Sequence, residues 1–255
     1  TAEYVWSPVA ERRRLTHVFF KRSVRLTAAP RSATLHVFAH TIYHLRVNGA
    51  MLGYGPARSY PEFPEYDTYD ITPHLRAGDN VIALDVGHTG SATFHHLPVD
   101  GAMIAWGAIV ADDGTRQSLA TPGEWRCALS PAHAPDTPRF SFAIGPVQIF
   151  DERKCPARWE RAHGTKQLKW QTPCVLTQHA FGALRPRSIP HLTQDERSAQ
   201  IVLRACRCEA EERLYSFLVL LDYDVNQHQP PAAVCVAYTY IFSPRAQRIE
   251  AGLWW

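Results

Sequence analysis

The sequence lacks long segments suited to a helix and long apolar segments. Its 255 residues include 19 prolines, which rarely leave room for a long helix, and no stretch approaches the roughly 18 apolar residues of a membrane-spanning helix. The N-terminal segment also lacks the apolar core of a secretory signal. We therefore expect a protein that does not enter a membrane and that is cytoplasmic, although removal of an upstream leader would leave the same sequence.

The chain also has little net charge and few cysteines. With 27 basic and 24 acidic residues, its formal charge is +3, which is too balanced for nucleic acid as the main partner. The basic cluster Arg12-Arg13-Arg14 is interpreted as a solvated face. Its six cysteines lack the paired CxxC spacing of a zinc site and are sparse for a disulfide scaffold. We expect buried free thiols.

Motifs that carry known chemistry are absent as well. There is no GxSxG elbow, P-loop or GxGxxG segment, so acyl transfer, phosphoryl transfer and dinucleotide chemistry have no support. Histidines occur close together as His95-His96, near Asp100, and as His40 with His44. Neighbouring residues on a strand point to opposite faces, so we expect no metal site from these pairs. The run at 151–153 is interpreted as a salt-linked structural loop.

What the sequence does contain is a series of short apolar runs rich in β-branched and aromatic residues. Tyr43, Leu45 and Val47 alternate with polar residues, and Asn48-Gly49 then supplies two residues that tolerate positive φ in a tight hairpin turn. The predicted strands cover 17–26, 33–39, 43–47, 81–86, 103–111 and 116–120. The expected fold is all-β, an antiparallel jelly-roll sandwich of the galactose-binding-like kind.

A domain boundary is predicted between residues 184 and 195. Arg185-Pro186-Arg187 and Ile189-Pro190 indicate a stiff extended connector. The sandwich is accordingly assigned to 1–190, and 191–255 to an incomplete second β unit with strands at 199–205, 214–223 and 232–242.

Four motifs in order carry a family resemblance. They are Tyr-x-Leu-x-Val-Asn-Gly (43–49), Gly-Pro-Ala-Arg-Ser (55–59), Tyr-Asp-x-Tyr-Asp-Ile-Thr (66–72) and Gly-x-Asn-Val-Ile-Ala (78–83). This order resembles the N-terminal β-sandwich of bacterial α-L-rhamnosidases, and a looser version is similar to the sugar-binding sandwich of β-galactosidase-type glycosidases.

The resemblance implies a parent glycoside hydrolase whose acid and base lie in an (α/α) barrel. No such region occurs in this sequence, so no catalytic residue is assigned, and a catalytic domain of the same protein becomes an expected partner. Two other interpretations stay open. One is a free-standing carbohydrate-binding or interaction module, and the other is a purely structural sandwich.

The connection from residue 58 to 69 is the best candidate for a sugar-binding rim, because it combines aromatic platforms with forked polar groups. The candidate residues for a rhamnose-containing glycan are Arg58, Tyr66, Asp67 and Tyr69. In the structural interpretation, Asp67 caps a turn, Tyr69 plugs the core edge and Arg58 contacts a neighbouring domain. No cofactor is expected, except that related sandwiches suggest a structural calcium ion, for which the nearest acids are Asp67, Asp70 and Asp79.

Overall fold

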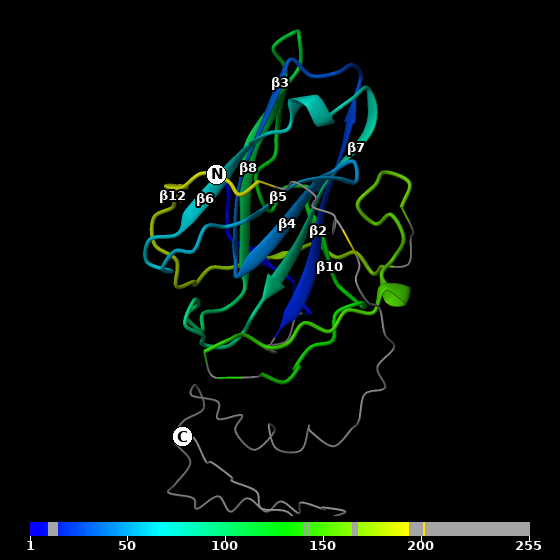
Figure 1. The fold of residues 1–255 in the computed structure, drawn as a ribbon. Coiled ribbons are helices and arrows are strands. Elements are labelled where there is room, and N and C mark those ends of the chain that lie inside the picture. Colours follow the sequence, from blue (N-terminus) through cyan, green and yellow to red (C-terminus); the bar gives the residue numbers. More distant parts are fainter. Residues whose placement is uncertain (10–14, 140, 142, 165–167, 194–200, 202–255) are drawn as a thin grey trace, which may run out of the picture.

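The computed structural model describes residues 1–9, 15–139, 141, 143–164, 168–193 and 201 (Figure 1). Several predictions lie outside these residues. They are the arginine cluster at 12–14, the strands at 199–205 (except Ile201), 214–223 and 232–242, and the cysteines at 206, 208 and 235.

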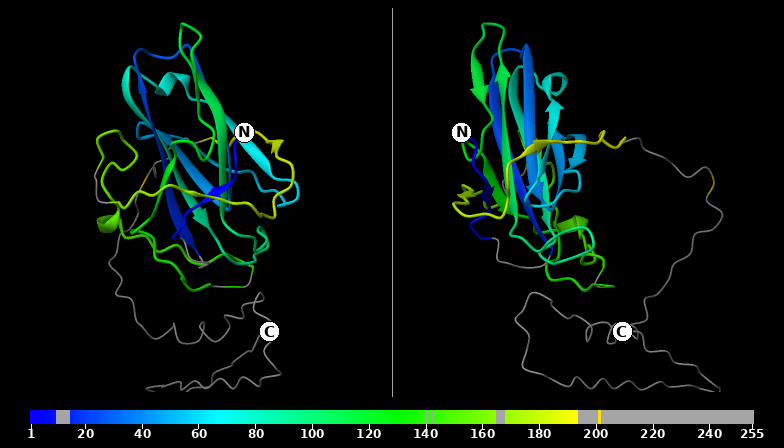
Figure 2. Two further views of the ribbon diagram at one scale, coloured as in Figure 1. Left: turned by 180° about the vertical axis from the view of Figure 1, so that it is seen from behind. Right: turned by 90° about the vertical axis from the view of Figure 1, so that its left-hand side faces the viewer.

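Two sheets, antiparallel except for the β6–β12 pair, form a β-sandwich, which is seen edge-on in the right-hand view of Figure 2. One sheet has the order β11 (Cys174–Val175), β1 (Val5–Trp6), β8 (Ala102–Val110), β3 (Ser32–His40), β6 (Glu65–Asp70), β12 (Arg185–Pro186), with β9 (Arg116–Ser118) also paired to β8. The other has the order β10 (Arg126–Leu129), β2 (Thr16–Leu26), β7 (Gly78–His88), β4 (Ile42–Val47), β5 (Ala50–Gly55). The predicted all-β sandwich is confirmed, and each strand predicted before residue 121 is present.

Helical structure in the described part of the chain consists of two short 3-10 turns, η1 (Thr72–His74) and η2 (Glu152–Lys154). No helix there is long and apolar enough to span a membrane. Asp151 accepts hydrogen bonds from the backbone N–H of Arg153 and from its side chain at 2.9 Å, so the predicted salt-linked loop is confirmed.

The core lies between the sheets and follows the alternation seen in the sequence. Tyr43, Leu45 and Val47 of β4 are fully buried, and the inward residues of β7 pack in the same cluster. Burying one such aliphatic side chain contributes about 1.5 to 3 kcal/mol. This cluster is therefore the main source of stability for the sandwich.

The Asn48-Gly49 turn has the predicted conformation, with φ of 52° at Asn48 and 86° at Gly49. The Asn48 side chain donates to the Asn80 side chain at 2.8 Å and accepts from the backbone N–H of Val81 at 2.9 Å. Asn80 in turn donates to the Arg76 carbonyl at 2.7 Å. Two of the sequence motifs, Asn-Gly and Gly-x-Asn, are therefore one hydrogen-bonded unit that fixes the β4–β5 hairpin against β7.

The predicted connector is part of the sandwich surface. β12 pairs in parallel with β6, and the backbone N–H groups of Arg185 and Arg187 donate to the carbonyls of Pro64 and Tyr66 at 2.9 Å each. Figure 1 shows this yellow segment beside β6 at the edge of the sheet. The chain at 185–187 is extended, as predicted, but it is held by hydrogen bonds along its length.

The three described cysteines are free and differ in exposure. Cys127 is buried, Cys155 is half-buried and Cys174 is exposed. Burial raises the pKa of the Cys127 thiol to about 11. The expectation of buried free thiols is confirmed for Cys127 and is wrong for Cys174, because β11 is a two-residue strand at the edge of its sheet.

Candidate functional site

The four predicted sugar-binding residues lie in three different places. Arg58 is exposed, Tyr66 is half-buried on the outer face of its sheet, and Asp67 and Tyr69 point into the sandwich with 0% and 9% of their surfaces exposed. The expectation of a single exposed rim is therefore wrong for Asp67 and Tyr69. β6 alternates its side chains between two faces, which separates Tyr66 from both.

Asp67 is the centre of a buried polar network. It accepts a hydrogen bond from the Tyr43 hydroxyl and an ion-paired hydrogen bond of 2.8 Å from Arg187, whose side chain is only 10% exposed. The hydroxyls of Tyr43 and Tyr69 are 3.1 Å apart. Burial raises the pKa of Tyr69 to about 12 and raises that of Tyr43 as well. We call Tyr43, Asp67, Tyr69 and Arg187 the Asp67 network, and it ties the segment after β12 to the core.

Tyr66 packs against two other rings on the outer face of the larger sheet. Its ring centroid is 4.7 Å from that of Trp106 and 5.6 Å from that of His36. His36 also stacks on Trp106 at 5.1 Å. Tyr66 is therefore part of an aromatic cluster on β3, β6 and β8, and it does not line the pockets that Arg58 lines.

The three acids predicted to hold calcium do not come together. Asp67 is occupied by the network, Asp70 accepts from the Thr72 N–H at 2.9 Å, and Asp79 pairs with Arg25 at 3.3 Å. Hydrogen bonds from Thr72 hold the pKa of Asp70 below its usual value. A calcium ion bound by these three stays a prediction without support from this geometry.

Arg58 lines an open cleft that we call the Arg58 cleft. It consists of two adjoining pockets of about 210 and 390 Å³, which share residues 58–61 and His96. One wall is the 54–61 segment, which consists of the last two residues of β5 and the loop after it. The other is the 93–97 segment, which is folded by hydrogen bonds of 3.0 Å from the backbone N–H groups of His95 and His96 to the Thr93 hydroxyl.

Aromatic and cationic groups border the Arg58 cleft. Tyr60 and Phe94 are 69% and 73% exposed, an unusual exposure for large rings with an apolar face. Arg58 donates to the ring nitrogen of His95 at 3.0 Å across the mouth. This contact links the two walls of the cleft.

The deep side of the Arg58 cleft contains neutral imidazoles. His40 and His96 line it, and His88 lies behind His40 at a ring distance of 5.8 Å. Burial lowers the pKa of each of the three to about 4. Among the described residues, the lining includes no aspartate or glutamate. The cleft therefore offers stacking surfaces and hydrogen-bonding groups, but not the pair of carboxylates that glycoside hydrolysis normally needs.

The sequence indicates only part of this site. The predicted 58–69 connection contains Arg58 and Tyr60, whereas His40, His96 and Phe94 come from other segments. The adjacent histidines at 95–96 have no metal-ligand spacing and give no other signal in the sequence. In the structure they sit on a loop with different exposures, and His40 and His44 lie on different sheets.

Comparison with known proteins gives consistent results. Residues 28–193 match the family model described as Alpha-L-rhamnosidase N-terminal domain. A curated Alpha-L-rhamnosidase of Streptomyces avermitilis is 26% identical over 137 residues, which are 50% of this chain and 13% of that protein.

Solved structures resemble the sandwich as well. The crystal structure of a GH78 family rhamnosidase of Bacillus sp. GL1 is 30% identical with a TM-score of 0.64, and the match covers 75% of this chain and 20% of that one. The Streptomyces avermitilis alpha-L-rhamnosidase in complex with L-rhamnose is 21% identical with a TM-score of 0.51, covering 66% and 17%, and this likeness concerns the fold alone. The chain thus spans a fifth or less of these relatives.

Proposed function

Because the chain belongs to the family of alpha-L-rhamnosidase N-terminal domains, we propose that it is a non-catalytic accessory domain of an α-L-rhamnosidase-type glycoside hydrolase. In this proposal the catalytic domain of the same protein cleaves the sugar, and the sandwich helps to recognise the glycan. The observation that carries the proposal is the Arg58 cleft, whose described lining has aromatic rings and the Arg58 guanidinium but no carboxylate.

The chemistry of the cleft supports a carbohydrate ligand. A sugar presents one apolar face that stacks on an aromatic ring and a rim of hydroxyls that pair with planar polar groups. Tyr60 and Phe94 are the exposed rings, and Arg58 is the forked donor. An open site of this kind is expected to bind a single rhamnose weakly, with a Kd in the millimolar range, or about 4 kcal/mol.

The test is an NMR titration of the chain with L-rhamnose and with a rhamnose-capped oligosaccharide. Shifts are expected for residues 58–61 and 93–97, and Tyr60→Ala should reduce them. The matched control is Phe63→Ala, because Phe63 is also exposed, at 54%, and stacks beneath Arg185 outside the described pockets. Loss of shifts in both variants, or no shift in the unaltered chain, would reject sugar binding at the cleft. Repeating the titration with calcium tests the proposed structural ion.

The alternative of a free-standing binding module predicts the same titration. The accessory role is favoured because the relatives are several times longer than this chain. It also predicts that the chain alone does not release rhamnose from an aryl rhamnoside. Steady turnover by the pure chain that is lost when one carboxylate is replaced would overturn the non-catalytic proposal, whatever the titration shows.

A further inference from the structure

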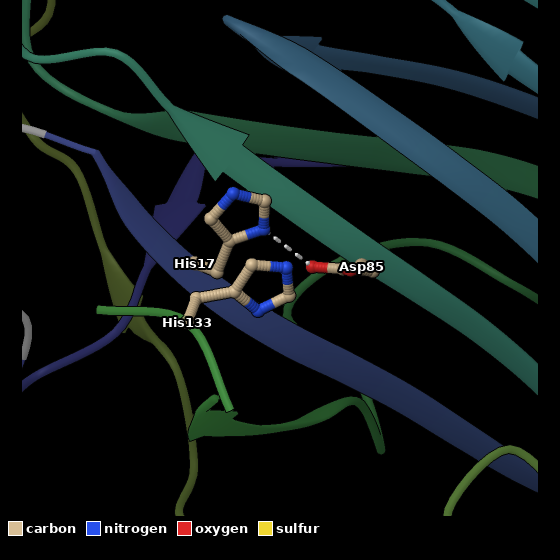
Figure 3. A group of neighbouring side chains, drawn as sticks. All are labelled: His17, Asp85 and His133. Carbon is tan, nitrogen blue, oxygen red and sulfur yellow. Dashed lines mark hydrogen bonds and ion pairs between the residues drawn. The ribbon is translucent and has the colours of Figure 1, made fainter. Parts of the chain in front are cut away.

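Three side chains with metal-ligand chemistry meet on the outer face of the smaller sheet, and none of them lines the Arg58 cleft. They are His17 of β2, Asp85 of β7 and His133 from the segment after β10 (Figure 3). One ligand atom from each lies within 4.8 Å of the others. No local sequence pattern marks this group, because its members are 48 or more residues apart.

The fold brings the three together through strand register. Phe19 pairs with Asp85, so His17, two residues before Phe19 on β2, shares the outer face with the Asp85 side chain. After β10 the chain turns back across this face, where the backbone N–H of Ser130 donates to the His17 carbonyl at 2.9 Å. His133 is thereby stacked on His17 with ring centroids 3.6 Å apart and nearly parallel planes.

The hydrogen bonds of His17 and His133 indicate that the group can hold a ligand. Nδ1 is the His17 nitrogen that faces the group, 3.0 Å from the Asp85 carboxylate, and it is the atom that would bind an ion. Nε2 of His17 points away from Asp85 (Figure 3) and is buried with no hydrogen-bond partner among the described residues. A 2.8 Å hydrogen bond joins Nδ1 of His133 to the Ser130 hydroxyl, which orients the ring and leaves its second nitrogen for the cluster. Metal-binding histidines are commonly held in this way by a hydrogen bond at the other nitrogen.

Burial of the group suits a bound cation. The side chains of His17 and Asp85 are 2% and 15% exposed, so a carboxylate is kept near two imidazoles with little water. Two imidazoles and one carboxylate are a ligand set for zinc, whereas calcium and magnesium prefer oxygen ligands.

We propose that His17, Asp85 and His133 form a Zn²⁺ site, with a water molecule or His44 in the fourth position. His44 pairs directly with Asp85 across β4 and β7 and shares its face. A tetrahedral ion at about 2.0 to 2.1 Å from each ligand places the ligand atoms about 3.3 Å apart, close to the His17–Asp85 separation. Because zinc lies near the plane of each imidazole that binds it, the two rings must tilt out of their parallel stack when the ion enters.

The test is zinc titration of the chain, prepared without a histidine tag, by isothermal calorimetry at neutral pH. One ion per chain is expected, with a Kd at or below about the micromolar range, and zinc should raise the melting temperature until a chelator is added. Asp85→Asn and His133→Ala should each weaken binding by at least about tenfold. His163→Ala is the matched control, because His163 is exposed and lies outside the group, and it should bind within about twofold of the unaltered chain.

Cobalt absorption provides a second readout that does not require a variant to fold. Co²⁺ in the site should give the spectrum of a four-coordinate nitrogen and oxygen site, without a thiolate charge-transfer band. The proposal is overturned if the intact chain binds no zinc stoichiometrically, if folded Asp85→Asn and His133→Ala both bind as tightly as the control, or if the cobalt spectrum shows thiolate ligation. This test is independent of sugar binding at the Arg58 cleft.

Discussion

The Asp67 network and the Arg58 cleft arise from the same short stretch of sequence but have opposite physical characters. Arg58 and Asp67 are nine positions apart, yet Asp67 is fully buried and Arg58 is exposed. In the network, each polar group has a partner within the protein. In the cleft, large rings and a cation face solvent. Polar and aromatic composition alone therefore does not distinguish a binding surface from a buried structural network.

The difference depends on whether a residue lies on a strand. Residues 56–61 follow β5 as a loop, in which the Arg58 and Tyr60 side chains are exposed although Ala57 and Pro61 are buried. Asp67 and Tyr69 occupy inward positions of β6, and the larger sheet buries them against β4. Replacing residues in each region tests this distinction directly.

The largest expected effect is for Asp67→Ala. It leaves the buried Arg187 guanidinium and the Tyr43 hydroxyl without their common partner, which should lower the free energy of unfolding by about 3 to 5 kcal/mol. Urea denaturation measures this. Asp112→Ala, at an exposed turn, is the control and should change stability by less than about 0.5 kcal/mol. Equal changes in the free energy of unfolding for the two variants would show that the Asp67 network does not stabilise the fold.

The second effect concerns acid. The pKa values of His40 and His88 are lowered to about 4 in the folded chain, against about 6.5 when unfolded. The unfolded chain therefore binds more protons between pH 6.5 and 4, so stability should fall as the pH is lowered through this window, by up to about 1.4 kcal/mol per pH unit for each histidine.

Urea denaturation at several pH values checks this, and His88→Gln should reduce the slope because glutamine does not titrate. An unchanged slope in that variant would mean that His88 already binds a proton in the folded state. The outcome sharpens the comparison, because the slope measures how strongly burial behind the Arg58 cleft disfavours a charged imidazole.

The third effect is at Gly55, which touches both regions. It lines the smaller pocket, and a Cβ added there would clash with the Asp67 carboxylate and lie 2.8 Å from the Tyr43 hydroxyl. Gly55→Ala should therefore cost about 1 to 3 kcal/mol by overpacking. Gly145→Ala is the control, since its Cβ would meet its nearest atom at 3.3 Å. A similar melting temperature for both variants would contradict the tight fit.

The smallest effect on stability is expected for Arg58→Ala. Its hydrogen bond to His95 is exposed, so its loss should change the free energy of unfolding by less than about 1 kcal/mol. The same variant should weaken rhamnose binding in the NMR titration. A large loss of stability with unchanged binding would place Arg58 with the structural residues.

The sequence was sufficient for features that depend on neighbouring residues. Alternation at Tyr43, Leu45 and Val47 predicted the inward face of β4, and Asn48-Gly49 predicted its turn. It was insufficient for features that depend on distant partners. Nothing near Asp67 indicates that Arg187 will neutralise it, and nothing near His17 indicates that His133 will stack on it. The alternation of side chains along a strand determines which face of the sheet a residue occupies, but the tertiary fold determines which residues cover that face.

The Asp67–Arg187 pair has a consequence for how the domain folds as it is made. The two residues are 120 positions apart, so at roughly 5 to 20 residues added per second the cation is synthesised about 6 to 24 s after the acid. Over that interval the carboxylate is without the cation that allows its burial, which disfavours closure of the sandwich around it. Synthesis of residue 187 is therefore the earliest point at which the larger sheet reaches its final packing, and ribosomal pausing before that codon should prolong exposure of the core to chaperones.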